Sequence, residues 1–81
     1  MPYWVYILRC NDDSLYTGIT INIEKRLALH SSGKGAKYTR GRVPLTLLHK
    51  EECQNRSEAL KREAAIKKLS RAEKLLLIKR N

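Results

Sequence analysis

A glutamate in the second half of the chain interrupts a stretch that is otherwise patterned as an apolar helix face. Over residues 55–69, a rotation of about 100° per residue gathers apolar side chains into one arc. The members of this arc are Ala59, Leu60, Ala64, Ile66 and Leu69. Glu63 falls inside the arc, where a carboxylate is costly unless it is paired or binds a cation. An ion pair with Lys67, four residues further on, and a metal ion are the two interpretations of this position.

Arg26 and His30 are the next candidates for chemistry. They stand four residues apart in a helix expected over residues 22–30, and they flank an apolar stripe formed by Ile23 and Leu27. Both side chains are therefore expected at the edge of the core, facing a sheet. There they can serve an anionic substrate. Alternatively, Arg26 pairs with a carboxylate and His30 is an ordinary half-buried histidine.

Two tyrosines, Tyr6 and Tyr16, lie mid-strand on the two arms of a predicted hairpin, in a chain with four tyrosines and no phenylalanine. A buried tyrosine usually packs and finds one hydrogen bond. The two rings share a sheet face only if the turn excludes an odd number of residues, for example a register that pairs Tyr6 with Gly18. Gly18 would leave space beside a tyrosine in which a phosphate can approach the backbone.

The elements that must position these residues follow a simple order of two strands, a helix, a strand and two helices. The expected boundaries are strands at 3–10, 14–20 and 43–50, a loop at 31–42, and helices at 22–30, 55–69 and from 70 onward. The pattern predicts an α+β domain spanning residues 1–81, in which helices cover a three-stranded sheet.

Capping patterns mark where these helices begin. Asn22 can cap the first helix. Asn55 opens the second, with Glu58 placed to complete a capping box, and Ser70 with Glu73 forms another box at the start of the last helix.

The charge of the chain is uneven. It carries 17 Lys and Arg against 8 Asp and Glu, a formal net charge of +9. Residues 1–24 hold one basic and three acidic side chains, whereas residues 25–81 hold sixteen basic and five acidic ones. Such a field attracts polyanions and makes binding salt-dependent. We therefore expect a nucleic-acid partner rather than a surface that is merely solubilising.

The cysteine content and the hydropathy pattern indicate a cytoplasmic protein. Cys10 and Cys53 are too few for a disulfide scaffold or a structural zinc site, so both are interpreted as thiols in a reducing compartment. No segment is patterned as a signal peptide, and none approaches the roughly 18 apolar residues of a membrane span.

Taken in chain order, these residues resemble the GIY-YIG nuclease superfamily. Trp-Val-Tyr at residues 4–6 and Tyr-Thr-Gly at residues 16–18 are similar to the two signature tripeptides. Arg26 and His30 follow as in the family's next helix, and Ala-Leu-Lys-Arg-Glu at residues 59–63 is similar to the helix that bears its metal-binding glutamate. The similarity covers nearly the whole chain and is greatest to short, stand-alone bacterial members. The chain departs from the pattern at Trp4, which replaces a glycine, and no asparagine lies between Glu63 and Asn81, so the family's late asparagine is missing or displaced.

The resemblance implies a three-stranded antiparallel sheet, with the order ββαβαα, and a divalent-metal-dependent nuclease, typically a DNA endonuclease of repair or recombination. Tyr6 would accept the proton of the attacking water as a phenolate held by nearby cations, although a free phenol has a pKa of about 10. Arg26 would bind the scissile phosphate through a bidentate fork, and Glu63 would hold Mg²⁺ or Mn²⁺. Tyr16 and His30 would position water or phosphate.

The basic loop over residues 31–42 would grip the nucleic-acid strand. It holds three glycines and no acidic residue, so we expect it to be mobile without nucleic acid. Tyr38 could stack on a base. The candidate binding side chains are Lys34, Lys37, Tyr38, Arg40 and Arg42.

Two other classes of function stay open. One is a catalytically weak nucleic-acid-binding module with the same fold. The other is an interaction protein, because the four consecutive apolar residues at 75–78 cannot all face one core and so favour contact with a second copy or a protein partner. In the main interpretation the partner is nucleic acid, DNA rather than RNA, and no membrane is involved.

Overall fold

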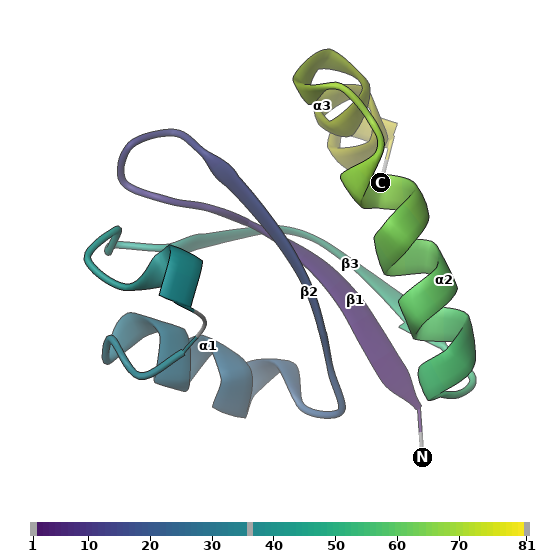
Figure 1. Ribbon diagram of the computed structural model, residues 1–81, viewed down its shortest axis with the longest axis horizontal. Helices are drawn as coiled ribbons and strands as arrows, with labels where there is room; N and C mark the ends of the chain where they lie inside the picture. The colour runs from purple at the N-terminus through teal and green to yellow at the C-terminus, as the bar shows by residue number, and fades with distance from the viewer. Residues whose placement is uncertain (1, 36, 81) are drawn as a thin grey trace.

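The computed structural model describes residues 2–35 and 37–80. Within these residues, three strands and three α-helices follow in the expected order ββαβαα, with a short 3₁₀ helix before the third strand (Figure 1). The elements are β1 (Tyr3–Arg9), β2 (Leu15–Thr20), α1 (Ile23–Ser31), η1 (Lys37–Thr39), β3 (Thr46–Cys53), α2 (Arg56–Lys67) and α3 (Arg71–Arg80). The predicted α+β class is confirmed.

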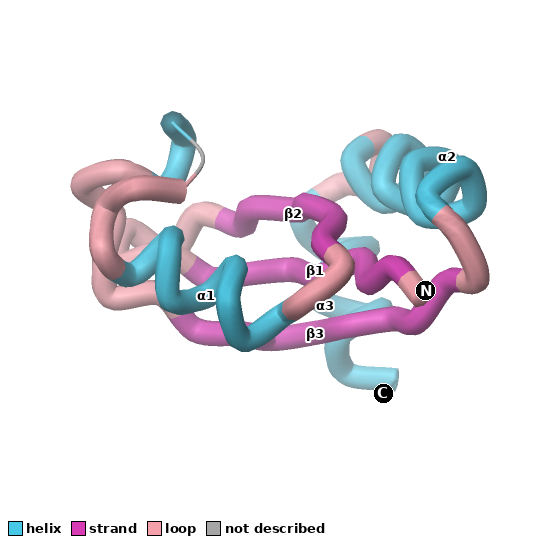
Figure 2. The backbone as a smooth tube through the Cα atoms, turned by 90° about the horizontal axis from the view of Figure 1, so that it is seen from below, coloured by secondary structure: helices cyan, strands magenta, loops and turns pink. Residues whose placement is uncertain are grey.

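Strand β1 is the centre of an antiparallel sheet with the order β2-β1-β3. Successive side chains of a strand point to opposite faces, so β1 presents two different surfaces. Val5 packs with Ala59 and Ile66 of α2 in the hydrophobic core. Tyr6 lies toward His30 of α1. Helices α2 and α3 therefore lie on one side of the sheet and α1 on the other (Figures 1 and 2).

The turn between β1 and β2 sets the register on which the two tyrosines depend. Tyr6 stands opposite Gly18. The N–H of Cys10 donates to the carbonyl of Ser14 at 2.9 Å, which leaves an odd number of residues in the turn. Tyr6 and Tyr16 therefore share one face of the sheet, so the condition that the turn excludes an odd number of residues is met.

Strand β3 begins later than predicted. The residues before Thr46 are held in the loop, because Pro44 has no N–H to give to a ladder and the carbonyl of Arg42 accepts a hydrogen bond from the N–H of Asn11 at 2.8 Å. The predicted start at residue 43 is therefore wrong.

The same strand also ends later than predicted, at Cys53 rather than Lys50. Glu51 stays in the strand, opposite Val5 of β1. Its carboxylate accepts two hydrogen bonds from Arg62 of α2, at 2.7 and 3.0 Å, so a charged residue is tolerated on the side of the sheet that faces the core. This contact joins a strand to a helix, so no local sequence pattern predicts it.

The predicted helix caps are confirmed. The side chains of Asn22 and Asn55 each accept a hydrogen bond from the backbone N–H three residues further on, at 3.0 and 2.9 Å. Ser70 and Glu73 form a reciprocal capping box at 3.2 and 2.9 Å. Because these bonds are local, each helix begins within a residue of its expected start.

Helix α2 turns a slightly different side toward the sheet than its apolar arc predicts. Ala59 and Ile66 are buried, but Leu60 is 37% exposed, so its predicted core position is wrong. Ala59 and Ile66 lie two turns apart, and the line between them passes Arg62 and Glu63, which are both half-buried. The pairing of Arg62 with β3 is compatible with this rotation and brings Glu63 toward the sheet.

Candidate active site

The central feature on the α1 side of the sheet is a pair of buried polar side chains, Tyr6 and His30. They are 1% and 0% exposed. The Tyr6 hydroxyl lies 3.0 Å from Nε2 of His30, and Nδ1 of His30 lies 2.7 Å from Oγ1 of Thr39. Both ring nitrogens of the histidine are therefore satisfied. The three side chains form one hydrogen-bonded row from β1 through α1 to η1.

Two glycines make room for this row. A Cβ on Gly18 would lie 2.6 Å from the Tyr6 hydroxyl and 3.0 Å from Cε2 of Tyr16. A Cβ on Gly35 would collide with the ring of His30. The space beside Gly18 is thus filled by the ring of Tyr6, so the expectation that a phosphate approaches the backbone there is wrong.

Tyr16 connects the buried row to the surface. Its ring centroid lies 6.2 Å from that of Tyr6 and 5.4 Å from that of His30. On its other side it stacks with Tyr38 of η1, with centroids 5.9 Å apart and ring planes at 25°. Tyr16 is half-buried, whereas Tyr6 and His30 are buried, so Tyr16 is more accessible to a ligand than Tyr6 is.

Arg26 of α1 brings a positive charge to the two tyrosines. Its hydrogen bond with Tyr6 is the main cause of its raised pKa, so the half-buried guanidinium stays charged. Its Nε–H is buried and has no hydrogen-bond partner among the described residues. No carboxylate among the described residues forms an ion pair with Arg26. The alternative interpretation, in which Arg26 pairs with a carboxylate, is therefore not found. A charged donor left unsatisfied is costly, which marks the position as suited to an anion.

Burial decides the protonation of Tyr6 and His30. It raises the pKa of the Tyr6 phenol, against the hydrogen bond and charge of Arg26, which lower it. It lowers the pKa of His30, with the charge of Arg26 as the second cause. At neutral pH both groups are uncharged. The expected Tyr6 phenolate therefore does not form in the protein alone, because desolvation outweighs the attraction of the cation.

Glu63 of α2 lies near the cluster of side chains formed by Tyr6, Tyr16, Arg26 and His30. It stands outside the hydrogen-bonded row within that cluster. Its charge raises the pKa of Tyr6, as a smaller cause than burial, so the carboxylate is within electrostatic reach of the phenol. Its side chain is 19% exposed, and Oε2 lies 3.5 Å from Nζ of Lys67. The i,i+4 ion pair is thus present, and the metal role stays a prediction. Residues 2–35 and 37–80 contain no group of three or more His, Cys, Asp or Glu that could hold a metal ion.

Two of the candidate nucleic-acid contacts already have partners inside the protein. Arg42 lies over the ring of Tyr38, with Cζ 4.3 Å from the centroid. Its Nε donates to the carboxylate of Asp12 at 3.1 Å. Tyr38 also stacks on Tyr16, so its ring already has two partners inside the protein, although the residue is 41% exposed.

The remaining basic positions are less determined. Lys34 and Arg40 are exposed, as a role in strand binding requires. The side chain of Lys37 lies outside what the structure describes. The binding roles of these residues and the mobility of the loop stay predictions.

The last helix divides its apolar residues between the core and the surface. Leu77 and Ile78 pack against the core, whereas Leu75 and Leu76 are 43% and 62% exposed. The expectation that the four cannot share one core is confirmed, and contact with a partner stays a prediction. Within residues 2–35 and 37–80, no helix has the length and apolar character needed to span a membrane.

Thr39 and Gly35 are site residues that the sequence analysis missed. Thr39 lies in a polar loop with no periodic pattern, and only its contact with His30 reveals its role. The glycines of the loop give a partial signal. Gly33 and Gly41 have positive φ angles of 80° and 74°, so they serve turns, but Gly35 serves the packing of a ring.

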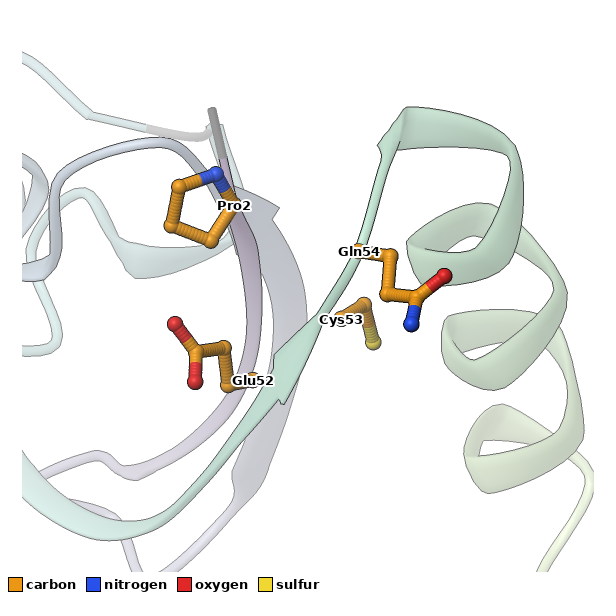
Figure 3. A pocket seen from close by; sticks show the side chains of 4 residues that line it. All are labelled: Pro2, Glu52, Cys53 and Gln54. Carbon is orange, nitrogen blue, oxygen red and sulfur yellow. The ribbon is translucent and has the colours of Figure 1, made fainter.

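A hollow of about 420 Å³ lies apart from this cluster, where β3 leads into α2 (Figure 3). It is lined by Pro2, Glu52, Cys53 and Gln54. Burial raises the pKa of the Cys53 thiol, so the group is protonated at neutral pH and is a poor nucleophile.

Comparison with known proteins places the cluster in a family. The GIY-YIG catalytic domain family matches residues 2–76. A UPF0213 protein of Syntrophus aciditrophicus is 63% identical over 79 residues, which cover 96% of this chain and 91% of that protein. A UPF0213 protein of Oceanobacillus iheyensis is 58% identical over 76 residues, covering 94% of this chain and 88% of that one.

Solved structures agree with these relatives. The solution NMR structure of a UPF0213 protein from Bacillus halodurans is 46% identical, with a TM-score of 0.63, and the match covers 98% of this chain and 84% of that one. A protein of E. faecalis, also solved by NMR, is 45% identical with a TM-score of 0.65, covering 95% and 83%. With Tyr6, Tyr16, Arg26 and His30 gathered on one side of the sheet, this chain belongs to the GIY-YIG family.

Proposed function

We propose that the protein is a divalent-metal-dependent nuclease that hydrolyses phosphodiester bonds, with DNA rather than RNA as substrate, in repair or recombination-type processing. The observation that carries the proposal is the guanidinium of Arg26, which lies beside two phenols and keeps an unpartnered Nε–H among the described residues. The fork of a guanidinium matches the oxygens of a phosphodiester. The net charge of +9 supports a polyanionic substrate, and the GIY-YIG family supports a nuclease.

Arg26 and Tyr16 would receive the scissile phosphate, because they are the half-buried members of the cluster. Arg26 would neutralise charge that grows on the phosphate in the transition state. Tyr16 would orient a phosphate oxygen or the attacking water through its hydroxyl.

Tyr6 and His30 would move the proton of that water. Arg26 offers only donors to the Tyr6 oxygen, so we assign the phenolic proton to the bond with Nε2 of His30. As the Tyr6 oxygen takes a proton from water, its own proton passes to Nε2. The resulting imidazolium donates through Nδ1–H to Thr39. The lowered pKa of His30 leaves it neutral, and able to accept, at neutral pH.

Glu63 would hold the metal ion. Among the described residues its carboxylate has one ion-pair partner, Lys67 at 3.5 Å, so it retains oxygen lone pairs for a cation. A single carboxylate, completed by water and substrate phosphate, suits Mg²⁺ or Mn²⁺. Such an ion, when bound, supplies Lewis-acid stabilisation of the phosphate and the leaving oxygen.

One observation favours a second function, the binding of nucleic acid without cleavage. Tyr6 is 1% exposed, and Glu63 is engaged by Lys67. If Tyr6 stayed buried and Glu63 stayed paired with Lys67 when nucleic acid bound, the protein would bind the strand without cleaving it.

A cleavage screen with Mg²⁺ and Mn²⁺ on single-stranded, duplex, flap and branched DNA tests the proposal. We expect EDTA to abolish cleavage and Glu63→Gln to lower the cleavage rate by a factor of about 10² to 10⁴. The free energy of unfolding should change by no more than about 0.5 kcal/mol in this variant. Glu52→Gln is the matched control, because Glu52 is exposed on β3 and lies outside the cluster. Binding without cleavage of any substrate would overturn the nuclease and favour the binding module, whereas full cleavage by Glu63→Gln would overturn the role of Glu63 as the metal ligand.

A further inference from the structure

A hollow of about 240 Å³ lies beside the edge strand β2, between the loop and the two C-terminal helices. Its lining comes from four elements, β2, η1, α2 and α3. The lining residues are Leu15, Tyr16, Thr17, Tyr38, Lys67 and Lys74. Pockets for ordinary small molecules measure about 300–1,000 Å³, so this hollow suits a single nucleotide-sized group.

The charge of the hollow is positive. Among the described residues, two lysines and no acidic residue line it. Lys67 is paired with Glu63 at 3.5 Å, but its side chain is 54% exposed and can turn to another anion. Lys74 forms no ion pair with any residue that the structure describes. The two ammonium groups come from different helices and face one space, an arrangement that suits a phosphate.

The other walls of the hollow are apolar and aromatic, a character that the binding of a phosphate alone does not require. Leu15, Tyr16 and Tyr38 line the hollow and give it an apolar and aromatic side. Tyr16 and Tyr38 stack on each other and Arg42 lies over Tyr38, so a base would contact the parts of the rings that these partners leave free. Thr17 is 4% exposed, and its Oγ1 finds no hydrogen-bond partner among the described residues. A nucleotide combines a phosphate for lysines with a flat base for aromatic rings, and a base can enter such a hollow only when it is unpaired.

We propose that this hollow binds one unpaired nucleotide next to the scissile phosphate, so that the substrate has a single-stranded stretch. Tyr16 supplies the link, because it lines the hollow and lies 5.4 Å, between ring centroids, from His30 of the catalytic cluster. A strand held by Arg26 would continue past Tyr16, with its next phosphate at Lys67 and Lys74. The inference rests on the proposed nuclease function, but it concerns binding and can fail independently of cleavage.

Titration of the labelled protein with a short oligothymidylate of about 10 nucleotides, in EDTA and followed by amide NMR, tests the site. We expect shifts at residues 15–17 and at Lys74. Lys74→Gln should weaken binding and reduce the salt slope by about 0.7, the loss of one single-strand phosphate contact. Lys79→Gln, an exposed site on the same helix that does not line the hollow, is the matched control and should change both quantities less.

Three further arms separate the alternatives. A duplex of the same length should shift the hollow less than the single strand does, and inorganic phosphate should shift Lys74 without residues 15–17. A polyglutamate peptide should compete poorly. Equal effects of Lys74→Gln and Lys79→Gln, equal shifts with duplex, or equal competition by polyglutamate would each overturn the unpaired-nucleotide site. If the amide signals of the hollow do not shift while EDTA-sensitive cleavage persists, the unpaired-nucleotide site is wrong and the proposed nuclease function is unaffected.

Discussion

The hydroxyl of Tyr6 and Nε2 of His30 lie 3.0 Å apart in an interior that excludes solvent from both residues. Burial moves their pKa values in opposite directions, upward for Tyr6 and downward for His30, so both are neutral at pH 7. Proton transfer between this neutral acid and neutral base forms a phenolate and an imidazolium side by side, so neither buried charge is isolated. Thr39 can accept a hydrogen bond from the imidazolium, and Arg26 can donate one to the phenolate.

Replacing Tyr6 by Phe should remove cleavage and preserve the fold. The ring still fills the space beside Gly18, but the oxygen that accepts the water proton is gone. We expect cleavage to fall by about 10² to 10⁴, the usual loss for an acid–base group. Single-turnover rates and the thermal melting curve measure the two effects. Unchanged cleavage by Tyr6→Phe would remove this tyrosine from the reaction.

Acidification should destabilise the protein through His30. Its folded pKa lies below the ordinary value of about 6.5, so the unfolded chain binds the proton first. The stability is fully present above pH 6.5 and is lost as the pH falls through the folded pKa. Urea unfolding between pH 7.5 and 5.5 (about one unit either side of 6.5) should show the decline, and His30→Gln should flatten it. A folded-state NMR titration of the ring at or above the ordinary pKa would contradict the prediction.

A second pH effect should appear at lower pH, through Glu51. The hydrogen bonds of Arg62, and then of His49, lower the pKa of this carboxyl. The stability it contributes is present above the unfolded value of about 4.3 and is lost as the pH falls through the folded one. Glu51→Gln should cost about 1 kcal/mol at pH 7, since the pair is only partly shielded from solvent. Glu52→Gln, at the exposed neighbouring position, should cost less, and an equal cost in both variants would refute a specific pairing.

Replacing Gly18 by Ala should disturb the cluster from the backbone side. The new methyl would lie 2.6 Å from the Tyr6 hydroxyl, so the ring must shift or the strands must part. Overpacking of this kind costs about 1–3 kcal/mol. Removal of the hydroxyl in the double variant Gly18→Ala/Tyr6→Phe should recover part of the loss. Denaturant unfolding of all four proteins completes the cycle, and strictly additive costs would show that the two positions do not contact each other.

The sequence by itself determined the features that depend on neighbours along the chain. The caps at Asn22, Asn55 and Ser70 are bonds between residues three apart, so their patterns are legible locally. For the hairpin, the sequence supplied only the condition of an odd turn, and the structure meets it with Tyr6 opposite Gly18. The order of motifs, with Glu63 set among apolar residues, indicated the family that the comparisons show.

Tertiary structure alone decided the features that join distant segments. The late end of β3 depends on Arg62 of α2 reaching Glu51, eleven residues away in the chain. Thr39 meets His30 only because the loop folds back over α1. Burial keeps Tyr6 protonated, and it depends on how the whole face of the sheet is packed. It therefore cannot be predicted from the residues next to Tyr6 in the sequence. The hollow at Lys74 likewise exists only where four elements meet, because the free energy of such contacts depends on the assembled neighbours and not on sequence spacing.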